Sequence, residues 1–305
     1  MSRIAQNTST QTAAMERQAV SLNTFLVLGK HRIASLAAMS AAAGYVLSAG
    51  RLDWGLLAAI GGTFLLACAS GALNQWQETD VDARMKRTCG RPLPMGTITP
   101  LTALIFSSMA CALGTSILLI GANPLAAGLG LLAMASYNLL YTPLKRVTPW
   151  AALPGSIVGA IPPLLGWAAA GGSIFEPAAL SIAVYFFIWQ VPHFWLLLLY
   201  FGSDYQRSGL PCLLNVLGER KLARATWVGI VLTALAAGAG IWLAGGINAI
   251  WAGLSLAAAS AWLVWSSRSL IHGNELKAGS VKKSFISINI FALVVLIVLS
   301  TGALF

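Results

Sequence analysis

Residues 74–100 contain the side chains best suited to chemistry in this chain of 305 residues. Asn74, Glu78 and Asp82 recur at every fourth position, so on an α-helix they follow one side, each displaced by about 40° from the last. Asp80 falls off this line, nearer the opposite face. Carboxylate and amide oxygens are the ligands that Mg²⁺ prefers. The spacing therefore predicts a metal site formed by Asn74, Glu78 and Asp82.

Basic side chains follow these acids and are suited to bind phosphate oxygens. The candidates for binding a diphosphate are Lys86, Arg87, Arg91, Lys145 and Arg146. The bases alone fit an ordinary cytoplasmic loop of a membrane protein equally well. Acids at the end of an apolar helix, beside an Asn, are costly without a partner, which favours a functional role for Glu78 and Asp82. Together the two sets predict a Mg²⁺-diphosphate site at a membrane surface.

The composition excludes a soluble domain, because 57% of the residues are hydrophobic and only 9% are charged, whereas about 25% are charged in soluble domains. The formal net charge is +10, but the bases are confined to a few connections, so we expect no nucleic-acid partner. The lipid bilayer is the expected environment. No CxxC or paired Cys/His metal spacing occurs, and we expect free thiols at the four cysteines.

Nine apolar stretches are each long enough to cross a hydrocarbon core of about 30 Å as a helix. They are residues 33–50, 54–73, 101–121, 124–143, 151–171, 178–200, 225–245, 249–267 and 285–304. Residues 1–20 are polar and expected to be mobile, and residues 21–32 read as a short interfacial helix that ends in a basic cluster. The predicted fold is all-α, a single intramembrane domain of nine transmembrane helices over residues 21–305.

The positions of the bases predict the orientation of this bundle. Eighteen of the nineteen Lys and Arg residues lie in the N-terminal region or in long connections, and only Arg51 lies in a short one. By the positive-inside rule, the N-terminus is cytoplasmic and the C-terminus lies outside. Residues 74–100 and 201–224 then share the cytoplasmic side.

Two further positions are candidates. Asp204 is the acid of the connection after the sixth stretch that lies near the membrane boundary, and it would supply a further Mg²⁺ ligand or belong to a solvated loop. His193 lies within the sixth stretch, after Pro192 and before Phe194 and Trp195. It would be an axial ligand or polar contact for a flat aromatic substrate, or a hydrogen-bonded histidine of the core.

The motifs at these positions resemble the UbiA superfamily of intramembrane prenyltransferases. The resemblance rests on N-x3-[DE]-x3-D followed by M-x-R-T and R-P-L, and on YTPLKR, GAIPPLLGW and PHFW at residues 141–146, 159–167 and 192–195. Within the superfamily, the pattern is similar to the branch of protohaem IX farnesyltransferases (haem O synthases). Three departures occur: Glu78 in place of the usual Asp, the run from Lys30 to Ile33, and residues 208–214 after Tyr205.

The resemblance implies a Mg²⁺-dependent transfer of the farnesyl group of farnesyl diphosphate to a vinyl group of haem B, giving haem O and diphosphate. It implies that Asn74, Glu78, Asp82 and Asp204 hold Mg²⁺ and that the bases bind diphosphate, and we expect His193 and Trp195 to contact haem. We expect the bacterial inner membrane, with the active site on the cytoplasmic side, and a haem A synthase or terminal oxidase as downstream partner.

Three alternatives stay open. A related prenyltransferase acting on an aromatic quinone precursor would need a basic pocket for a carboxylate, where this sequence offers PHFW. A transporter would line both membrane halves with polar residues, but nearly all ionisable groups here lie on one predicted side. The intact Asn74, Glu78 and Asp82 argue against a non-catalytic assembly factor.

Overall fold

The computed structural model describes residues 21–244, 249–272 and 276–304, and all regular structure within them is helical. Nine of these helices are long and apolar enough to cross a membrane, which confirms the prediction for the described residues. They are α3 (His31–Ala49), α4 (Trp54–Gln77), α6 (Pro100–Gly121), α7 (Pro124–Ala135) with η1 (Ser136–Tyr141) and α8 (Thr142–Val147), α9 (Ala152–Gly155) with α10 (Ile157–Ala169), α11 (Pro177–Tyr200), α14 (Glu219–Ala244), α15 (Ala249–Ser267) with η2 (Arg268–Leu270), and α16 (Ala278–Leu304). The predicted mobility of residues 1–20 lies outside the described residues.

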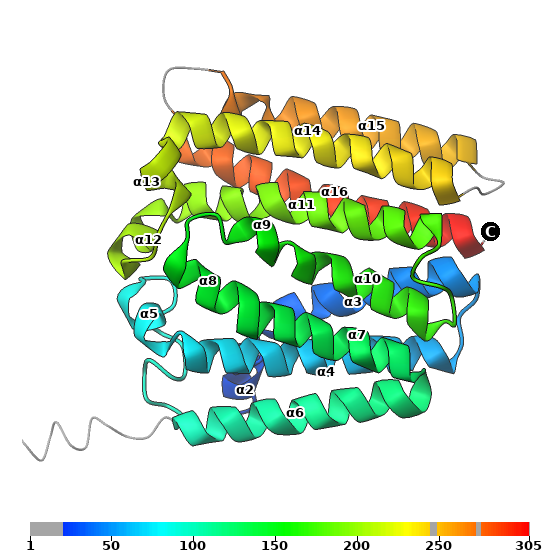
Figure 1. Cartoon of the computed structure of the whole chain (residues 1–305). Coiled ribbons are helices and arrows are strands. Elements are labelled where there is room, and N and C mark those ends of the chain that lie inside the picture. The colour runs from blue at the N-terminus through cyan, green and yellow to red at the C-terminus, as the bar shows by residue number, and fades with distance from the viewer. Residues whose placement is uncertain (1–20, 245–248, 273–275, 305) are drawn as a thin grey trace, which may run out of the picture.

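The long helices run side by side, and the short segments that carry the candidate site gather at one end of the bundle (Figure 1). These are α5 (Thr79–Arg84), α8, α12 (Gly202–Ser208) and α13 (Leu213–Leu217). The C-terminal end of α16 lies at the opposite end. We call the first of these the site end. The two long connections thus share one end, whereas the side of the membrane that this end faces remains a prediction.

Two apolar cores divide the bundle into halves. In the first half, α3, α4, α6, α7 and α10 enclose a cluster that includes Leu66, Leu118 and Leu165. In the second half, α11, α14, α15 and α16 enclose another cluster, with Leu263 and Ile288 fully buried. The halves meet where α10 packs against α11 and α16 against α3.

Local signals explain where the helices begin and how closely they pack. Asp53, Thr99 and Asn123 each accept a hydrogen bond from a backbone N–H in the first turn of α4, α6 and α7, which satisfies one of the unpaired donors there. Where α3 crosses α10, a Cβ at Gly44 or Gly166 would overlap the backbone of the other helix. Small residues permit this approach, as is common between membrane helices.

The boundaries differ from the predictions in several places, and the seventh and ninth spans begin at Glu219 and Ala278 rather than at residues 225 and 285. The first span begins at His31, because α2 (Leu22–Leu28) ends early and Lys30 has a positive φ of 52° that turns the chain. The second span continues past residue 73 to Gln77, which brings Asn74 into α4. The expected unbroken helix over residues 74–82 is interrupted at Glu78, whose φ and ψ of −112° and 17° separate α4 from α5.

Candidate active site

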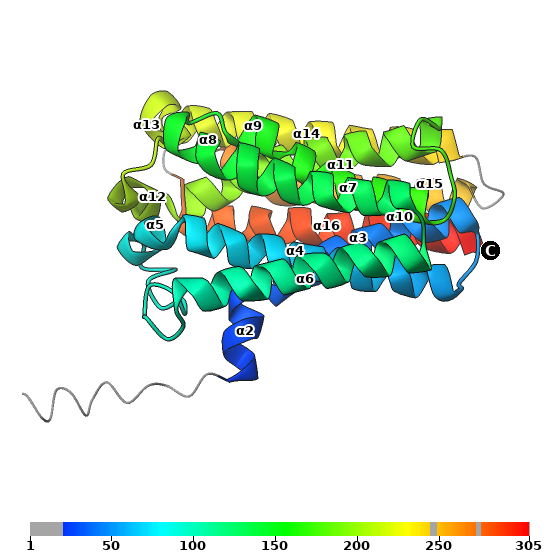
Figure 2. The ribbon, with the colours of Figure 1, turned by 60° about the horizontal axis from the view of Figure 1, so that its bottom comes forward.

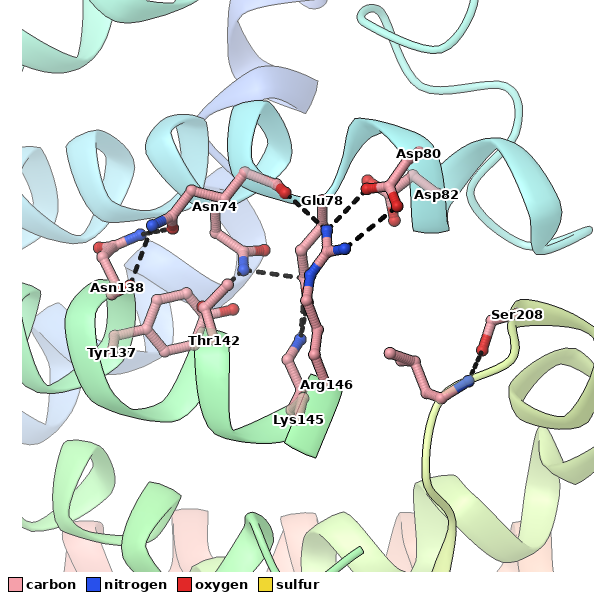
Figure 3. A network of polar contacts seen from close by, with 12 residues as sticks. Asn74, Glu78, Asp80, Asp82, Tyr137, Asn138, Thr142, Lys145, Arg146 and Ser208 are labelled. Carbon is pink, nitrogen blue, oxygen red and sulfur yellow. Dashed lines mark hydrogen bonds and ion pairs between the residues drawn. The ribbon is translucent and has the colours of Figure 1, made fainter. Parts of the chain in front are cut away.

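The three predicted metal-site residues remain on one side of the chain despite the break at Glu78. The backbone N–H of Glu78 still donates to Asn74 O at 2.9 Å, and that of Asp82 donates to Glu78 O at 2.8 Å. All three side chains are buried, at 1%, 5% and 3% exposure. Asp80, by contrast, points to the exposed side, as its position off the line predicts. Figure 3 shows the arrangement.

Asn74 is the centre of the buried polar network. Its side-chain nitrogen donates to Glu78 Oε2 and to Thr142 Oγ1, both at 2.9 Å. Its Oδ1 accepts from Lys30 Nζ at 2.5 Å. The amide therefore joins α4 to α8 and to the turn before α3, so that it aligns groups from three separate segments.

Each buried carboxylate holds one cation from a different segment. Lys145 Nζ lies 2.6 and 2.8 Å from the two oxygens of Glu78, and Arg91 Nη1 lies 2.6 Å from Asp82 Oδ2. Burial favours the neutral acid, but Lys145 and Lys30 outweigh this effect and hold the pKa of Glu78 below its ordinary value. Glu78 is therefore an anion in the neutral pH range.

The other predicted diphosphate ligands are placed differently. Arg146 pairs with Asp80 on the exposed side, at 2.6 Å, and Lys86 is exposed. The guanidinium of Arg87 stacks on the Phe201 ring, 4.9 Å from its centroid. Of the five predicted bases, Arg91 and Lys145 are the two whose side chains pair with Asp82 and Glu78 among the described residues.

Lys30 is a site residue that the sequence analysis did not select. Its ammonium contacts Asn74 and the Tyr137 hydroxyl, the latter at 3.3 Å. Burial, together with the nearby cations Arg91 and Lys145, lowers the pKa of Lys30 to about 7. A non-glycine residue with positive φ is uncommon and often marks a functional position.

Gln75 holds the turn that presents Lys30. It is fully buried, and its Nε2 donates to Val27 O at 2.8 Å and Leu28 O at 2.9 Å, the last carbonyls of α2. A Cβ at Gly71 would lie 2.9 Å from the Gly29 carbonyl oxygen, so α4 approaches the turn closely. Because α2 projects from the side of the bundle (Figure 2), this clamp ties it to the site.

A second network fixes the helix opposite α4. Asn138 exchanges hydrogen bonds with Ser70 and with Gln77 at 2.7 to 3.1 Å. It lies in η1, a π-helical segment within the fourth span, and such segments are frequent at functional sites. The segment turns Tyr137 toward Lys30. The Tyr137 hydroxyl is engaged inside the bundle, where it accepts a hydrogen bond from Lys30 Nζ.

An apolar cavity of about 130 Å³ opens directly beneath the polar network. Lys30 and Tyr137 line it at the polar end, while Thr63, Gly130 and Leu165 line it deeper in the first half. Along α4 it extends from Gly71 to Thr63, which corresponds to roughly 12 Å of helix. A charged head group at Asn74 would thus continue into space suited to an apolar chain.

Asp204 faces the first motif from α12. It is 6% exposed, and its Oδ2 accepts from the backbone N–H of Arg87 at 3.2 Å. Among the described residues, no three acidic, His or Cys side chains lie close enough to hold a metal ion alone. The carboxylates are instead suited to share Mg²⁺ with a phosphate ligand, which is the usual way that proteins bind this ion.

His193 lies in an aromatic cluster of the second half, formed by α11 and α16. Its ring centroid lies 4.6 Å from that of Trp189 and 5.1 Å from that of Phe285, and its buried Nδ1 has no hydrogen-bond partner among the described residues. Trp195 packs elsewhere, against the cluster around Leu213, because side chains two positions apart point to nearly opposite sides of a helix.

Tyr141 connects the two parts of the site. Its ring stacks on Phe194, with centroids 5.3 Å apart and planes 10° apart. On the other side, Lys145 Nζ lies 5.0 Å from the Tyr141 centroid. Tyr141 and Phe194 therefore form the aromatic connection between Lys145, the partner of Glu78, and His193.

Some site residues that were not predicted nevertheless lie within motifs identified in the sequence. Thr142 and Tyr141 belong to the YTPLKR motif, and Lys30 belongs to a run compared with a family motif. Gln75 had no such signal, because its role depends on the carbonyls of a separate helix.

Comparisons with known proteins agree with this geometry. Residues 33–299 match the model of the UbiA prenyltransferase family. A protohaem IX farnesyltransferase of Geobacter sulfurreducens is 41% identical over 214 residues, which are 70% of this chain and 77% of that protein. The same enzyme of Oleidesulfovibrio alaskensis is 40% identical, over 60% of this chain and 65% of that protein.

Solved structures share the fold at low identity. A digeranylgeranylglyceryl phosphate synthase has a TM-score of 0.73 at 18% identity, covering 95% of this chain and 99% of its own. A UbiA homologue of Archaeoglobus fulgidus bound to DMAPP and Mg²⁺ has a TM-score of 0.67 at 16% identity, covering 91% and 99%. Since the family match spans most of the sequence and the fold agrees, this chain belongs to the UbiA prenyltransferase family.

Proposed function

We propose that this intramembrane prenyltransferase transfers the farnesyl group of farnesyl diphosphate to a vinyl group of protohaem IX, giving haem O and diphosphate. The observation that carries the proposal is the buried set of Asn74, Glu78 and Asp82, joined through Asn74 to Lys30, which lines the polar end of an apolar cavity. The names of the relatives at about 40% identity support the choice of farnesyl donor and haem acceptor. The product would pass to a haem A synthase or a terminal oxidase.

The donor set fits Mg²⁺. Asn74, Glu78 and Asp82 offer hard oxygen atoms on successive turns, and Asp204 offers another from α12. When bound there, Mg²⁺ would neutralise charge on the diphosphate as it leaves. Lys30, Arg91 and Lys145 already balance the carboxylates, so they lie within reach of phosphate oxygens that bind beside them.

The chain's own groups then govern bond cleavage and alkylation. The bond between the allylic carbon and the diphosphate oxygen breaks, and the electron pair leaves with the diphosphate, stabilised by the cationic side chains. The tyrosine rings of Tyr137 and Tyr141 present faces that favour an adjacent cation. The allylic carbon bonds to the terminal vinyl carbon, and water adds to the resulting cation with loss of a proton. The apolar walls of the cavity keep other water away from the prenyl cation.

The acceptor would lie against His193 and Phe194. Neutral imidazole is a common ligand of haem iron, and the unpartnered Nδ1 of His193 is a costly buried group that such an interaction would satisfy. We expect His193→Ala to weaken haem binding and change the haem absorption spectrum, with farnesyl diphosphate binding retained. His272→Ala, at an exposed position, is the matched control. An unchanged spectrum in His193→Ala would remove this residue as a ligand.

Incubation of the purified protein with haem B, farnesyl diphosphate and Mg²⁺ tests the reaction directly. The expected product is haem O, identified by its mass, and its formation should stop when the metal is chelated. If haem B is unchanged but an aromatic quinone precursor is prenylated, the alternative acceptor is correct and the haem assignment is wrong.

We further propose that the protein lies in the bacterial inner membrane with the site end in the cytoplasm. The distribution of basic residues supports this orientation. A topology reporter fused after Phe305 should report from outside, and one inserted within residues 201–224 should report from the cytoplasm. A cytoplasmic signal from the Phe305 fusion would contradict the orientation.

A further inference from the structure

The second half of the bundle carries a concentration of positive charge at the site end, away from the acids of the active site. From Glu219 onward the sequence has only two acidic residues, Glu219 and Glu275, against seven Lys and Arg. These bases are Arg220, Lys221, Arg224, Arg268, Lys277, Lys282 and Lys283. The excess of bases that is usual on the cytoplasmic side of membrane proteins explains the number of these residues. It does not explain why Arg268 and Lys283 both lie close to one tryptophan ring.

Arg268 and Lys283 converge on one indole ring. The Arg268 guanidinium lies 5.0 Å from the Trp265 ring centroid, and Lys283 Nζ lies 5.4 Å from it. Arg268 belongs to η2 and Lys283 to α16, so tertiary packing brings them together. Neither forms an ion pair with an acid among the described residues. Two like charges around one ring repel each other, so the arrangement favours an anion between them.

Trp265 lies near the end of its candidate span, close to where lipid head groups are expected. It is 55% exposed, and it precedes the end of the span at Leu270 by five residues, which is roughly 7 Å of helix. Tryptophan is enriched at this level of the membrane. Its helix, α15, is the least buried of the nine candidate spans, so this site opens to lipid rather than to the protein core.

We propose that Arg268, Lys283 and Trp265 form a binding site for the phosphate head group of an anionic phospholipid from the surrounding bilayer. The two cations would bind the phosphate oxygens, and the indole would pack against the glycerol and upper acyl carbons. Each base near a membrane surface adds to the attraction of anionic lipid. Because Arg268 and Lys283 lie against the same Trp265 ring, they would hold the lipid phosphate at one position.

Retention of lipid by the purified full-length chain tests the site. The protein is reconstituted with phosphatidylglycerol or phosphatidylcholine, extracted in mild detergent, and examined by native mass spectrometry. The wild type should retain phosphatidylglycerol in preference to phosphatidylcholine. In the variant Arg268→Gln/Lys283→Gln, retention of phosphatidylglycerol should fall by about tenfold.

Two comparisons separate a defined site from general electrostatics. Lys277→Gln/Lys282→Gln removes the same charge from exposed positions of the same region and should leave retention nearly unchanged. Trp265→Leu keeps all charges and should still weaken retention. The proposal would be overturned by equal losses of retention in the two charge variants, or by unchanged retention in Trp265→Leu. It would also be overturned if inorganic phosphate displaced the bound lipid, or if the wild type retained both lipids equally.

Discussion

Glu78 and Asp82 each pair with a cationic side chain, whereas Asp204 on the facing helix α12 pairs with none among the described residues. The first pair is balanced by Lys145 and Arg91, and Asp204 is held by one backbone N–H. A partly buried cation that loses its ion-pair partner is destabilising, and we expect the loss of one acceptor by a backbone N–H to cost less. The two sides of the site should therefore differ in stability as well as in catalysis.

The largest effect is expected at the first pair. Asp82→Ala and Glu78→Ala should each reduce turnover by about a thousandfold or more, because each removes a hard ligand from a site that must neutralise a leaving diphosphate. Each should also lower the melting temperature, since the partly buried Arg91 or Lys145 loses its ion-pair partner. Product formation and thermal unfolding of the purified variants measure both effects. Substantial activity in either variant would contradict the assignment of this pair.

A smaller effect is expected at Asp204. Asp204→Ala should reduce turnover by about a hundredfold, because one ligand of a shared metal is lost. Its melting temperature should fall less than that of Asp82→Ala, since no cationic side chain loses an ion-pair partner. If Asp204→Ala proved the less stable of the two, the distinction between the two sides would fail.

Loss of the hydrogen bonds made by Gln75 should affect the binding of farnesyl diphosphate more than the rate of the chemical step. Gln75→Leu removes both hydrogen bonds to the end of α2, so Lys30 is held less well beside Asn74. We expect the KM for farnesyl diphosphate to rise about tenfold, with kcat changed little, because a positioned charge is lost from the binding site. Steady-state kinetics measure this split. A fall in kcat with an unchanged KM would show that Gln75 does not act through substrate binding.

The smallest effect is expected at Asp80. Asp80→Ala breaks exposed ion pairs with Arg84 and Arg146, and such pairs contribute little to stability. Turnover should stay within about threefold of wild type. Should Asp80 prove more sensitive than Glu78 or Asp82, the division into a buried catalytic side and an exposed side of this segment would be wrong.

The sequence alone determined the features that depend on composition and regular spacing. Nine apolar stretches predict nine spanning helices because each must satisfy its own backbone in lipid. The four-residue spacing of Asn74, Glu78 and Asp82 predicts their common side, and the same spacing separates Asp80 from them. These predictions hold because they require only the local geometry of a helix.

Only the tertiary structure decided which groups meet across helices. The positive φ of Lys30 turns its side chain to Asn74, and Gln75 stabilises that turn through carbonyls of another helix. Lys145 and Arg146 are adjacent in sequence, yet one pairs with buried Glu78 and the other with exposed Asp80. A sequence pattern specifies the face on which a residue lies, but its partner depends on how separate helices pack, and this packing is not encoded in any local period.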